Sequence, residues 1–349
     1  MVTQLVAGRV FDFSHAIGRG GGGGMGFSTG NAMVVGNGDD VYILSRGGEA
    51  ITAVPWNRTA RGARVGKFTV GSEAGDEEFV HEFGKYGDAP GEFIWPAGIA
   101  LDSQENIYVT DEWMNQVSVF SNEGTLLNTW GVSGSGEGEF DGPSGIARDA
   151  EDNFYIVDSR NHRVQKFTKD GQFLLSWGSY GSGEGQLDSP WGITIDHQGY
   201  VYVADYKNHR AQKFTPEGQF IAQFGRYGTG RGELNHPSDV TVDPDGDVYI
   251  CDWANNRVQV FGPDGKFVTS FIGDARELTK WSEMIVRTNP DALKRRREIK
   301  NPEIEWRLAM PRSVAFDSVK SRLLILDTQR SRVQIYNKLK EYVGPARNL

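Results

Sequence analysis

Hydrophobic and polar positions along the chain repeat as short apolar runs, each followed by a tight turn and an alternating segment. The apolar runs lie at residues 107–109, 155–157, 201–203, 248–250 and 323–326. Each run leads to an Asp that opens a ten-residue segment, at 111–120, 158–167, 205–214, 252–261 and 327–336. From Asp111 to Asp252 the spacing is 47 residues each time. The pattern predicts strand, turn and strand within each copy, and a fixed period of this length is typical of repeat architectures.

Four regular repeats open at Pro96, Pro143, Pro190 and Pro237, and each predicts four antiparallel strands. The fourth strands end in a large aromatic residue, at Trp130, Trp177, Phe224 and Phe271, which we expect to fill the wedge between neighbouring sheets. Residues 32–84 form a degenerate first repeat, and a sixth repeat opens at Pro311. The chain therefore predicts an all-β, six-bladed β-propeller with four-stranded antiparallel blades.

The first strand of the chain predicts how the ring closes. Residues 9–18 resemble the fourth strand of a later repeat, but they precede the first repeat. We expect this N-terminal strand to close the last blade by pairing with residues 332–336, since closure removes exposed sheet edges. Tail residues 340–343 are the alternative occupant of the same position.

Two insertions interrupt a single predicted domain that spans 1–349. Residues 55–78 are expected to form a long loop in the first repeat, and residues 274–310 read as helical. Asp274 and Glu277 resemble a capping box, and Leu278, Trp281, Met284 and Ile285 fall on one helical face. Asn289 followed by Pro290 predicts a second helix that continues to residue 300. The helical insertion is expected to act as a lid or as a docking element.

Composition and charge narrow the classes of function. The formal net charge of −9 argues against a broad DNA surface or an anionic-membrane surface, and it disfavours RNA binding. Cys251 is the only cysteine, so no intramolecular disulfide forms, and the count leans toward a reducing compartment. No signal peptide and no apolar run of roughly 18 residues is visible, which predicts a cytoplasmic protein without membrane insertion.

The repeated segments resemble a known family. Residues 161–167 and 208–214 read Asn-His-Arg-Val/Ala-Gln-Lys-Phe, and they follow a Pro-x-Gly-Ile motif and a strand that ends in Asp. These residues resemble NHL repeats, and the resemblance implies a six-bladed propeller. Relatives include RNA-binding propellers, interaction and sensor domains, and peptide-amidating lyases. More distant relatives are lactonase-like and streptogramin-lyase-like enzymes. The resemblance therefore leaves function to be argued from the site.

Two sets of polar residues are candidates for chemistry. Four repeats pair an Asp with an Arg, as in Asp158 and Arg163, whereas Gln116 stands at the Arg position after Asp111. The repetition favours a structural ion pair over a catalytic one. His162 and His209 occupy equivalent turn positions. In amidating lyases, histidines from several blades hold an axial metal, but two histidines fall short of the three protein ligands that a catalytic zinc prefers. We predict no cofactor, with Zn or Ca on the axis, held by His162 and His209, as the alternative.

A third set is aromatic and lies on one rim. Strand four leads into strand one, and strand two into strand three, at the same end of each blade. The candidate partner-binding residues are Trp95, Trp113, Arg160, Trp191, Tyr206, Lys207 and Trp253 on this rim, with Arg312 and Gln329 beside them and Trp281 in the helical insertion. Turn tips rich in Trp are typical of partner or ligand surfaces. We interpret the protein as a non-catalytic scaffold that binds a protein partner within a larger complex. The alternative is a propeller lyase or hydrolase with an axial metal.

Overall fold

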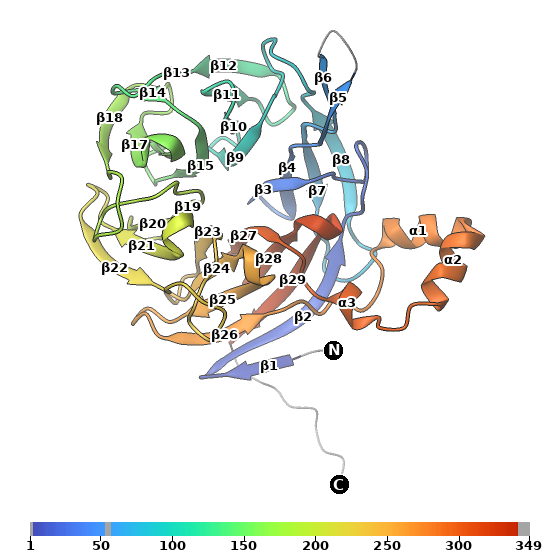
Figure 1. The fold of residues 1–349 in the computed structure, drawn as a ribbon. Coiled ribbons are helices and arrows are strands. Elements are labelled where there is room, and N and C mark those ends of the chain that lie inside the picture. The colour runs from blue at the N-terminus through green and yellow to red at the C-terminus, as the bar shows by residue number, and fades with distance from the viewer. Residues whose placement is uncertain (1–2, 53–56, 341–349) are drawn as a thin grey trace.

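Six antiparallel sheets, five of four strands and one of five, are arranged as blades around a central axis in the computed structural model, which describes residues 3–52 and 57–340 (Figure 1). Blade one contains β3 (Gly30–Val35), β4 (Asp40–Ser45), β7 (Arg64–Thr69) and β8 (Glu78–Phe83). Blade two contains β9 (Pro96–Leu101), β10 (Ile107–Asp111), β11 (Gln116–Phe120) and β12 (Leu126–Trp130). Blade three contains β15 (Pro143–Arg148), β16 (Phe154–Asp158), β17 (Arg163–Phe167) and β18 (Phe173–Trp177). The predicted fold class is confirmed.

The remaining blades follow the same order from the axis outwards. Blade four contains β19 (Ile193–Ile195), β20 (Val201–Asp205), β21 (Arg210–Phe214) and β22 (Phe220–Phe224). Blade five contains β23 (Pro237–Val242), β24 (Val248–Asp252), β25 (Arg257–Phe261) and β26 (Phe267–Phe271). Blade six contains β27 (Pro311–Asp317), β28 (Arg322–Asp327), β29 (Arg332–Leu339) and β2 (Arg9–Ile17). A two-residue parallel pair, β13 (Val132–Ser133) and β14 (Glu139–Phe140), lies in the connection between blades two and three.

The hydrophobic core lies between neighbouring blades. The second strand of each regular blade is buried along its whole length, because sheets pack against both of its faces. The aromatic residues that end the fourth strands reach the next blade. Trp130 of blade two lies 5.0 Å from Phe167 of blade three, and Trp177 lies 6.1 Å from Phe214, measured between ring centroids. These rings fill the wedges as the sequence predicts.

The N-terminal strand closes the ring. β2 pairs with β29 over its length, from Val10 opposite Leu339 to Ile17 opposite Val333, which confirms the predicted closure. β1 (Thr3–Val6) then pairs with β2 as a fifth strand, which the sequence analysis did not predict. Of the competing tail, residues 341–343 lie outside the described residues.

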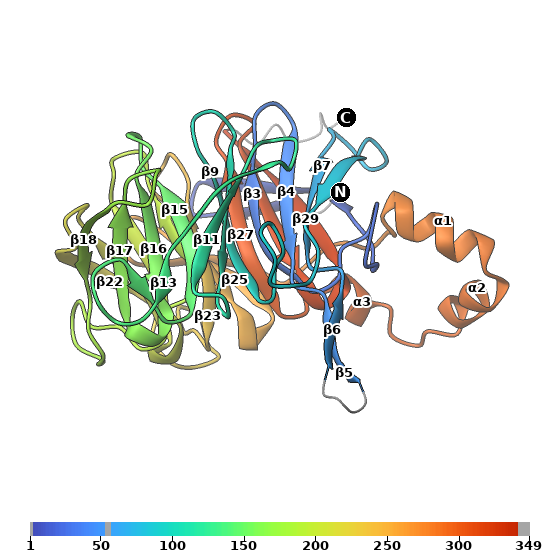
Figure 2. The same cartoon turned by 90° about the horizontal axis from the view of Figure 1, so that it is seen from above.

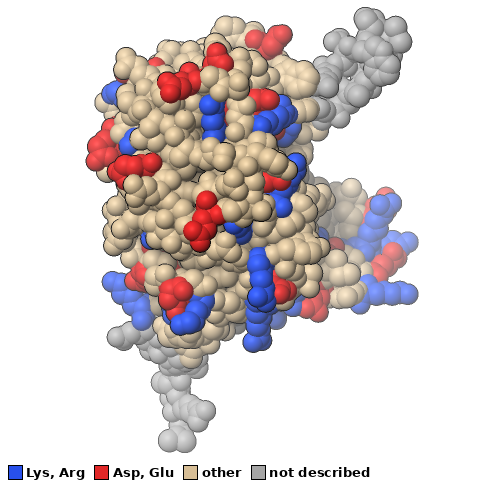
Figure 3. Space-filling model, turned by 60° about the vertical axis from the view of Figure 1, so that its left-hand side comes forward, with Lys and Arg blue, Asp and Glu red and all other residues tan. Residues whose placement is uncertain are grey.

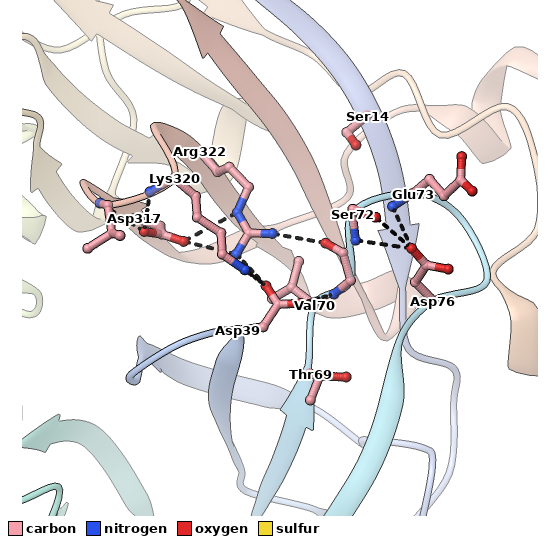
Figure 4. A network of polar contacts seen from close by, with 12 residues as sticks. Ser14, Asp39, Thr69, Val70, Ser72, Glu73, Asp76, Asp317, Lys320 and Arg322 are labelled. Carbon is pink, nitrogen blue, oxygen red and sulfur yellow. Dashed lines mark hydrogen bonds and ion pairs between the residues drawn. The ribbon is translucent and has the colours of Figure 1, made fainter.

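A polar network joins blade one to blade six on the side of the ring where β3 turns into β4 (Figure 4). Arg322 donates to Asp39 and Asp317, both at 2.9 Å, and to the carbonyl of Gly71 at 2.9 Å. Lys320 adds a second cation at Asp39. The network therefore links β28 to the turns of blade one across the seam where the ring closes.

The insertion in the first blade differs from its prediction. A hairpin of β5 (Gly48–Thr52) and β6 (Asn57–Arg61) lies between the second and third strands of the blade. Residues 64–69 of the predicted 55–78 loop are the third strand itself, because β7 pairs with both β4 and β8. Residues 55–56 lie outside the described residues. The hairpin projects beyond the other turns of its face (Figure 2).

Three helices form the second insertion. They are α1 (Lys280–Thr288), α2 (Pro290–Arg297) and α3 (Glu303–Trp306). α1 begins at Thr279, whose hydroxyl accepts a hydrogen bond from the Ser282 amide at 3.2 Å, so the capping box predicted at Asp274 is wrong. Asp274 instead accepts from the hydroxyl of Tyr336 at 3.2 Å in the core. Asn289 caps α2 with Pro290 in the first turn, as predicted.

The helices α1 and α2 extend sideways from the ring beside β2 and β8 (Figures 1 and 2). They do not cover the axial opening, so the lid prediction for 274–310 is wrong. No helix in the described part of the chain is long and apolar enough to cross a membrane.

Candidate functional site: the tryptophan face and the axial channel

The predicted aromatic residues gather at the face where the first strands begin and the second strands end. We call this the tryptophan face and define it by Trp95, Trp113, Trp191, Tyr206 and Trp253. Single-turn 3-10 helices follow the second strands of blades three to six, at Ser159–Asn161, Tyr206–Asn208, Trp253–Asn255 and Thr328–Arg330. These tight turns project their first residues at the face, which explains why residues just after the repeated Asp assemble there.

The repeated Asp and Arg serve blade architecture, as the sequence predicts. The Asp158 carboxylate accepts hydrogen bonds from Arg163 at 2.8 Å, from Asn161 at 2.8 Å and from the Asp141 amide at 2.7 Å. Arg163 also donates to carbonyls of the connection that arrives from blade two. Burial raises the pKa of Asp158, and the hydrogen bonds from Asn161, the Asp141 amide and Arg163 oppose that shift. The same arrangement recurs around Asp205.

The two turn histidines also hold neighbouring blades together. Nδ1 of His162 accepts from the Ser189 amide, and Nδ1 of His209 accepts from the His236 amide, both at 3.1 Å. Both residues adopt the left-handed backbone conformation at the end of their turns. The side chain of Asn115 accepts from the Gly142 amide at 2.8 Å in the same way. Among the described residues, no three His, Cys, Asp or Glu side chains come together to hold a metal ion.

A cluster of charged and aromatic side chains crosses the centre of the tryptophan face. We call Arg46, Glu112, Trp191 and Arg312 the axial cluster. The Arg312 guanidinium stacks 4.1 Å above the centroid of Trp191, whose indole N–H donates to Glu112 at 3.2 Å. Glu112 also accepts from Arg46 at 3.4 Å. These contacts join blades one, two, four and six.

The axial cluster carries two guanidinium groups and one carboxylate. Burial lowers the pKa of Arg312 to about 10, Glu112 opposes this shift, and nearby Arg46 adds to it. Arg312 therefore stays charged at neutral pH. None of the described residues accepts a hydrogen bond from its guanidinium, so stacking on Trp191 and attraction to the Glu112 carboxylate hold the cation at the axis.

Further aromatic rings extend the cluster outwards. Arg46 lies 4.5 Å from the centroid of Trp95, which packs edge-on against Trp113 at 5.1 Å. On the other side, Tyr206 lies 4.9 Å from Trp191 and 6.2 Å from Trp253. The structure thus brings the five predicted aromatic residues into two groups on either side of the axial cluster.

The other predicted residues lie apart from the axis. Arg160 pairs with Asp141 at 3.1 Å and Lys207 approaches Asp188 at 4.0 Å, both at exposed positions on the same face. Trp281 is only 3% exposed and packs 5.8 Å from Phe68. It is a core residue that anchors α1 to blade one, so the prediction that it belongs to the binding surface is wrong.

An axial channel of about 660 Å³ runs along the innermost strands beneath the tryptophan face. Its lining extends from Trp191 and Arg312 at one end to Asp102 and Glu105 at the other. Asp239 also faces the channel, and its carboxylate accepts from the Ser313 hydroxyl at 2.8 Å and from the Val314 amide at 3.0 Å. Burial raises the pKa of Asp239 to about 6 despite these donors.

Several of these residues were not predicted from the sequence. Arg46 and Glu112 occupy the same repeat position as Tyr206 and Trp253, directly after the end of strand two. This shared position is the sequence signal that places them on the same face. Asp239 stands where three other blades have glycine. Two exposed tyrosines of the same face were also missed. Tyr180 and Tyr227 are each 68% exposed and lie 4.9 Å from His162 and 4.6 Å from His209.

Acidic and basic side chains are interspersed over the side of the molecule shown in Figure 3. On this side the two signs of charge alternate, and neither forms a broad patch.

Comparisons with known proteins identify the repeats and the fold. The model of the NHL repeat matches four segments, residues 93–120, 140–167, 187–214 and 234–261. A catalytically inactive virginiamycin B lyase from Staphylococcus aureus, solved with quinupristin, is 12% identical, with 89% of this chain and 95% of that chain covered and a TM-score of 0.54. A streptogramin B lyase is 11% identical, with 86% and 87% covered and a TM-score of 0.51.

A protein of unknown function from Bacteroides thetaiotaomicron is similar as well. It is 18% identical, with 95% of this chain and 76% of that chain covered and a TM-score of 0.59. Identities this low show a shared fold alone. No curated protein matches the sequence.

Proposed function

This chain is an NHL-repeat six-bladed β-propeller, and we propose that it is a non-catalytic binding module that recognises a protein partner through the tryptophan face. The fold hosts both binding proteins and enzymes, so the proposal rests on the site. The observation that carries it is the collection of Trp, Tyr and Arg side chains from five blades on one face. These residue types are enriched at the energetic centres of protein interfaces.

The exposed rings on this face suit a partner surface. Trp113 is 48% exposed and Tyr180 and Tyr227 are 68% exposed, so a partner that covers them removes large apolar areas from water. Each ring packs against a neighbouring aromatic ring. Packing of this kind limits the side-chain freedom that is lost on binding. The β5–β6 hairpin projects from the same face and offers a partner a second point of contact (Figure 2).

The polar residues that resemble a catalytic set already have structural partners. His162 and His209 use Nδ1 to bind the next blade, and the repeated Asp and Arg hold the connections between blades. These side chains therefore have roles that need no substrate.

Partner capture tests the proposal. The chain is recovered from its native cells under mild cross-linking, as the wild type and as the double variant Trp113→Ala/Trp253→Ala. The matched control is Leu127→Ala/Ile221→Ala, which removes two apolar side chains that are 55% and 43% exposed on the outermost strands β12 and β22. Removing two interface anchors is expected to weaken binding at least about 30-fold, since each contributes roughly 1–2 kcal/mol or more.

We expect a stoichiometric partner that the control retains and the Trp113/Trp253 variant loses. If both variants retain it, the tryptophan face is not the interface. If both lose it, the capture depends on exposed apolar area in general.

An enzyme with an axial metal is the second candidate, and Asp239 is the observation that favours it. A carboxyl with a pKa of about 6 in a channel can act as an acid or a base near neutral pH. The virginiamycin B lyase that shares the fold is an example of a propeller enzyme. Metal analysis of protein purified without an affinity tag separates the two candidates, because a stoichiometric, tightly held Zn²⁺ or Ca²⁺ contradicts a plain binding module.

A further inference from the structure

Successive blades are joined at the tryptophan face by a repeated hydrogen bond whose acceptor varies. The residue at the end of the turn after strand two accepts from a backbone amide in the connection that leads to the next blade. This acceptor is an amide oxygen at Asn115 and Asn256 and an imidazole nitrogen at His162 and His209. Asparagine keeps its acceptor at any pH, whereas histidine loses it on protonation, because both nitrogens of an imidazolium carry hydrogen.

His162 and His209 differ in what an added proton meets. A carboxylate oxygen of Asp188 lies 3.7 Å from Nδ1 of His162, so a protonated His162 gains a charged acceptor when it loses the amide. At the next junction the residue equivalent to Asp188 is the uncharged Asn235, and it is followed by a second histidine, His236. A proton on His209 therefore meets another imidazole where a proton on His162 meets a carboxylate.

The two imidazoles at the junction of blades four and five are in contact. The ring centroids of His209 and His236 are 4.5 Å apart, with the rings packed edge-on. Nδ1 of His209 accepts from the His236 amide at 3.1 Å, and Nδ1 of His236 lies 2.8 Å from the Oδ1 acceptor of Asn235. No group of three metal-ligating side chains includes this pair in the described part of the chain. The geometry is that of a neutral pair that shares one backbone hydrogen bond.

The charged groups around the pair favour its neutral form. Burial lowers the pKa of His209, the neighbouring His236 lowers it further, and Asp252 opposes both to a smaller extent. The Asp252 carboxylate already accepts from Arg257 at 2.7 Å and from Asn255 at 2.9 Å. Burial lowers the pKa of His236 as well. Two imidazolium ions in contact repel each other, so protonation works against the arrangement of this junction.

The histidine pair is continuous with the aromatic rings of the tryptophan face. The His236 ring lies 4.6 Å from Tyr206, which packs 4.9 Å from Trp191. On the other side of the pair, the His209 ring lies 4.6 Å from the exposed Tyr227. Histidine is the side chain whose charge ordinarily changes between pH 5 and 8, so the two imidazoles are the members of this stack that gain charge. A displaced imidazole therefore moves rings that the proposed partner covers.

We propose that His209 and His236 form an acid-sensitive switch that controls the tryptophan face. Protonation of His209 removes the acceptor for the His236 amide, repulsion separates the two rings, and the junction of blades four and five opens locally. The closed junction binds protons less tightly than the open one, so its stability is complete above about pH 6.5 and falls as the pH drops below that value. The consequence for the partner rests on the proposed function, since an open junction is expected to bind that partner more weakly.

The chain without a partner tests the switch itself. NMR measures the protection of the His236 amide from hydrogen exchange at pH 7.5, 6.5 and 5.5, corrected for the intrinsic pH dependence of exchange. We expect this protection to fall about 10-fold between pH 7.5 and pH 5.5, because one proton with an open-state pKa near 6.5 shifts the equilibrium by that factor. The Gly142 amide, which Asn115 accepts at 2.8 Å, is the internal reference and is expected to keep its protection.

Two substitutions taken from other junctions remove the titrating groups. His209→Asn supplies the acceptor found at Asn115, and His236→Ser supplies the residue found at Ser189, which has the same left-handed backbone conformation as His236. The double variant is expected to keep the amide of residue 236 protected at pH 5.5. His162→Asn is the matched control, because it removes a histidine from a different junction, and it is expected to respond to acid like the wild type.

The effect on the partner is measured with the partner recovered in the capture experiment. Its affinity for the purified chain is determined at pH 7.5 and at pH 5.5. We expect the wild type to bind about 10-fold more weakly at pH 5.5, and the double variant to bind equally at both values.

Two results overturn the proposal. The first is a His236 amide that keeps its protection at pH 5.5, or loses it in step with the Gly142 amide, whatever the partner does. The second is an affinity that falls equally in the wild type and in the double variant. Failure of the proposed function is distinguishable, because the Trp113→Ala/Trp253→Ala variant then retains the partner while the His236 amide still reports the switch. Matching circular dichroism spectra at pH 7.5 and 5.5 separate local opening from global unfolding.

Discussion

Asp239 is expected to make the free energy of unfolding fall as the pH rises from 4 to 7. Burial raises the pKa of its carboxyl in the folded chain from the ordinary value of 3.8 to about 6. The folded state therefore holds this proton more tightly than the unfolded state. The stabilising contribution is complete below pH 3.8 and is lost as the pH rises through about 6.

The size of the effect follows from the gap between the two pKa values. Each pH unit between them corresponds to about 1.36 kcal/mol, so a gap of about two units gives roughly 3 kcal/mol. This is an upper limit, because Asp239 is partly accessible from the channel and water there reduces the cost of ionisation. Two neighbouring groups, Cys251 and Arg312, keep the same protonation state over this pH range. Burial raises the pKa of Cys251 well above its ordinary value, and Arg312 stays protonated.

Urea unfolding followed by tryptophan fluorescence measures the effect in the wild type and in Asp239→Asn at pH 4, 5, 6 and 7. Other titrating groups contribute equally to both proteins, so the difference between the two curves isolates Asp239. We expect the wild type to lose up to about 3 kcal/mol relative to the variant between pH 4 and pH 7. Asp239→Ala provides a second comparison, since blade one has Ala32 at this position.

Parallel curves for the wild type and both variants would refute the reasoning. They would mean that the carboxyl titrates as an ordinary solvated Asp and that the channel does not desolvate it.

Three further predictions concern the packing of the blades and of the helical insertion. Trp281→Ala leaves a cavity at a buried site and is expected to lower the free energy of unfolding by about 3–5 kcal/mol. The control Met284→Ala, at a 53% exposed position, is expected to change it by less than about 0.5 kcal/mol, and equal urea midpoints for the two variants would contradict the prediction. Asn289→Ala removes the cap of α2 and is expected to destabilise that helix by about 1 kcal/mol, seen as faster amide exchange within Pro290–Arg297, and unchanged exchange would count against the cap. His162→Ala removes the acceptor for the Ser189 amide and is expected to lower the free energy of unfolding, measured in urea, by about 1 kcal/mol, whereas His162→Asn is expected to restore most of that loss. If the Asn variant is as unstable as the Ala variant, the hydrogen bond between the blades does not contribute to stability.

The fold was predictable because several repeats specify the same answer. The spacing of the repeated Asp residues defines the blades, and the match between residues 9–18 and later fourth strands predicts that β2 pairs with β29. Each blade repeats the same local solution, so an ambiguous assignment in one copy is resolved by the others. This support is absent where the chain leaves the repeat.

Both errors in the helical insertion arise because no repeated copy constrains the assignment there. Asp274 and Glu277 have the spacing of a capping box, but the Asp274 carboxylate is bound by Tyr336, 62 residues away in sequence, and the helix begins at Thr279. Trp281 lies on the apolar face of α1 and is buried against Phe68, a partner that no local pattern in the sequence identifies. In both cases a tertiary contact decides which local signal prevails.

The site was predictable in part for the same reason. The aromatic rim follows from knowing which turns share a face. The axial cluster depends on which side chains meet across the axis. Glu112 of blade two accepts a hydrogen bond from Trp191 of blade four, and the repeat pattern does not predict contacts between blades that are not neighbours. Only the phase of Arg46 and Glu112 within the repeat pointed to the axis.

The repeat also separates structural demands from functional ones, position by position. His162, His209 and Asn115 differ in residue type but present the same acceptor to the next blade, so variation there preserves a structural hydrogen bond. Asp239 and Gly192 occupy the same repeat position, but one carries a carboxylate and the other has no side chain, so the blade fold does not require a carboxylate there. An Asp239→Gly chain should therefore keep the fold, as three blades already do with glycine, while the channel loses the Asp239 carboxylate. The same logic points, for a function specific to this chain, to positions where the blades differ, such as Asp239 and the aromatic residues of the tryptophan face, and not to the motif that makes it a propeller.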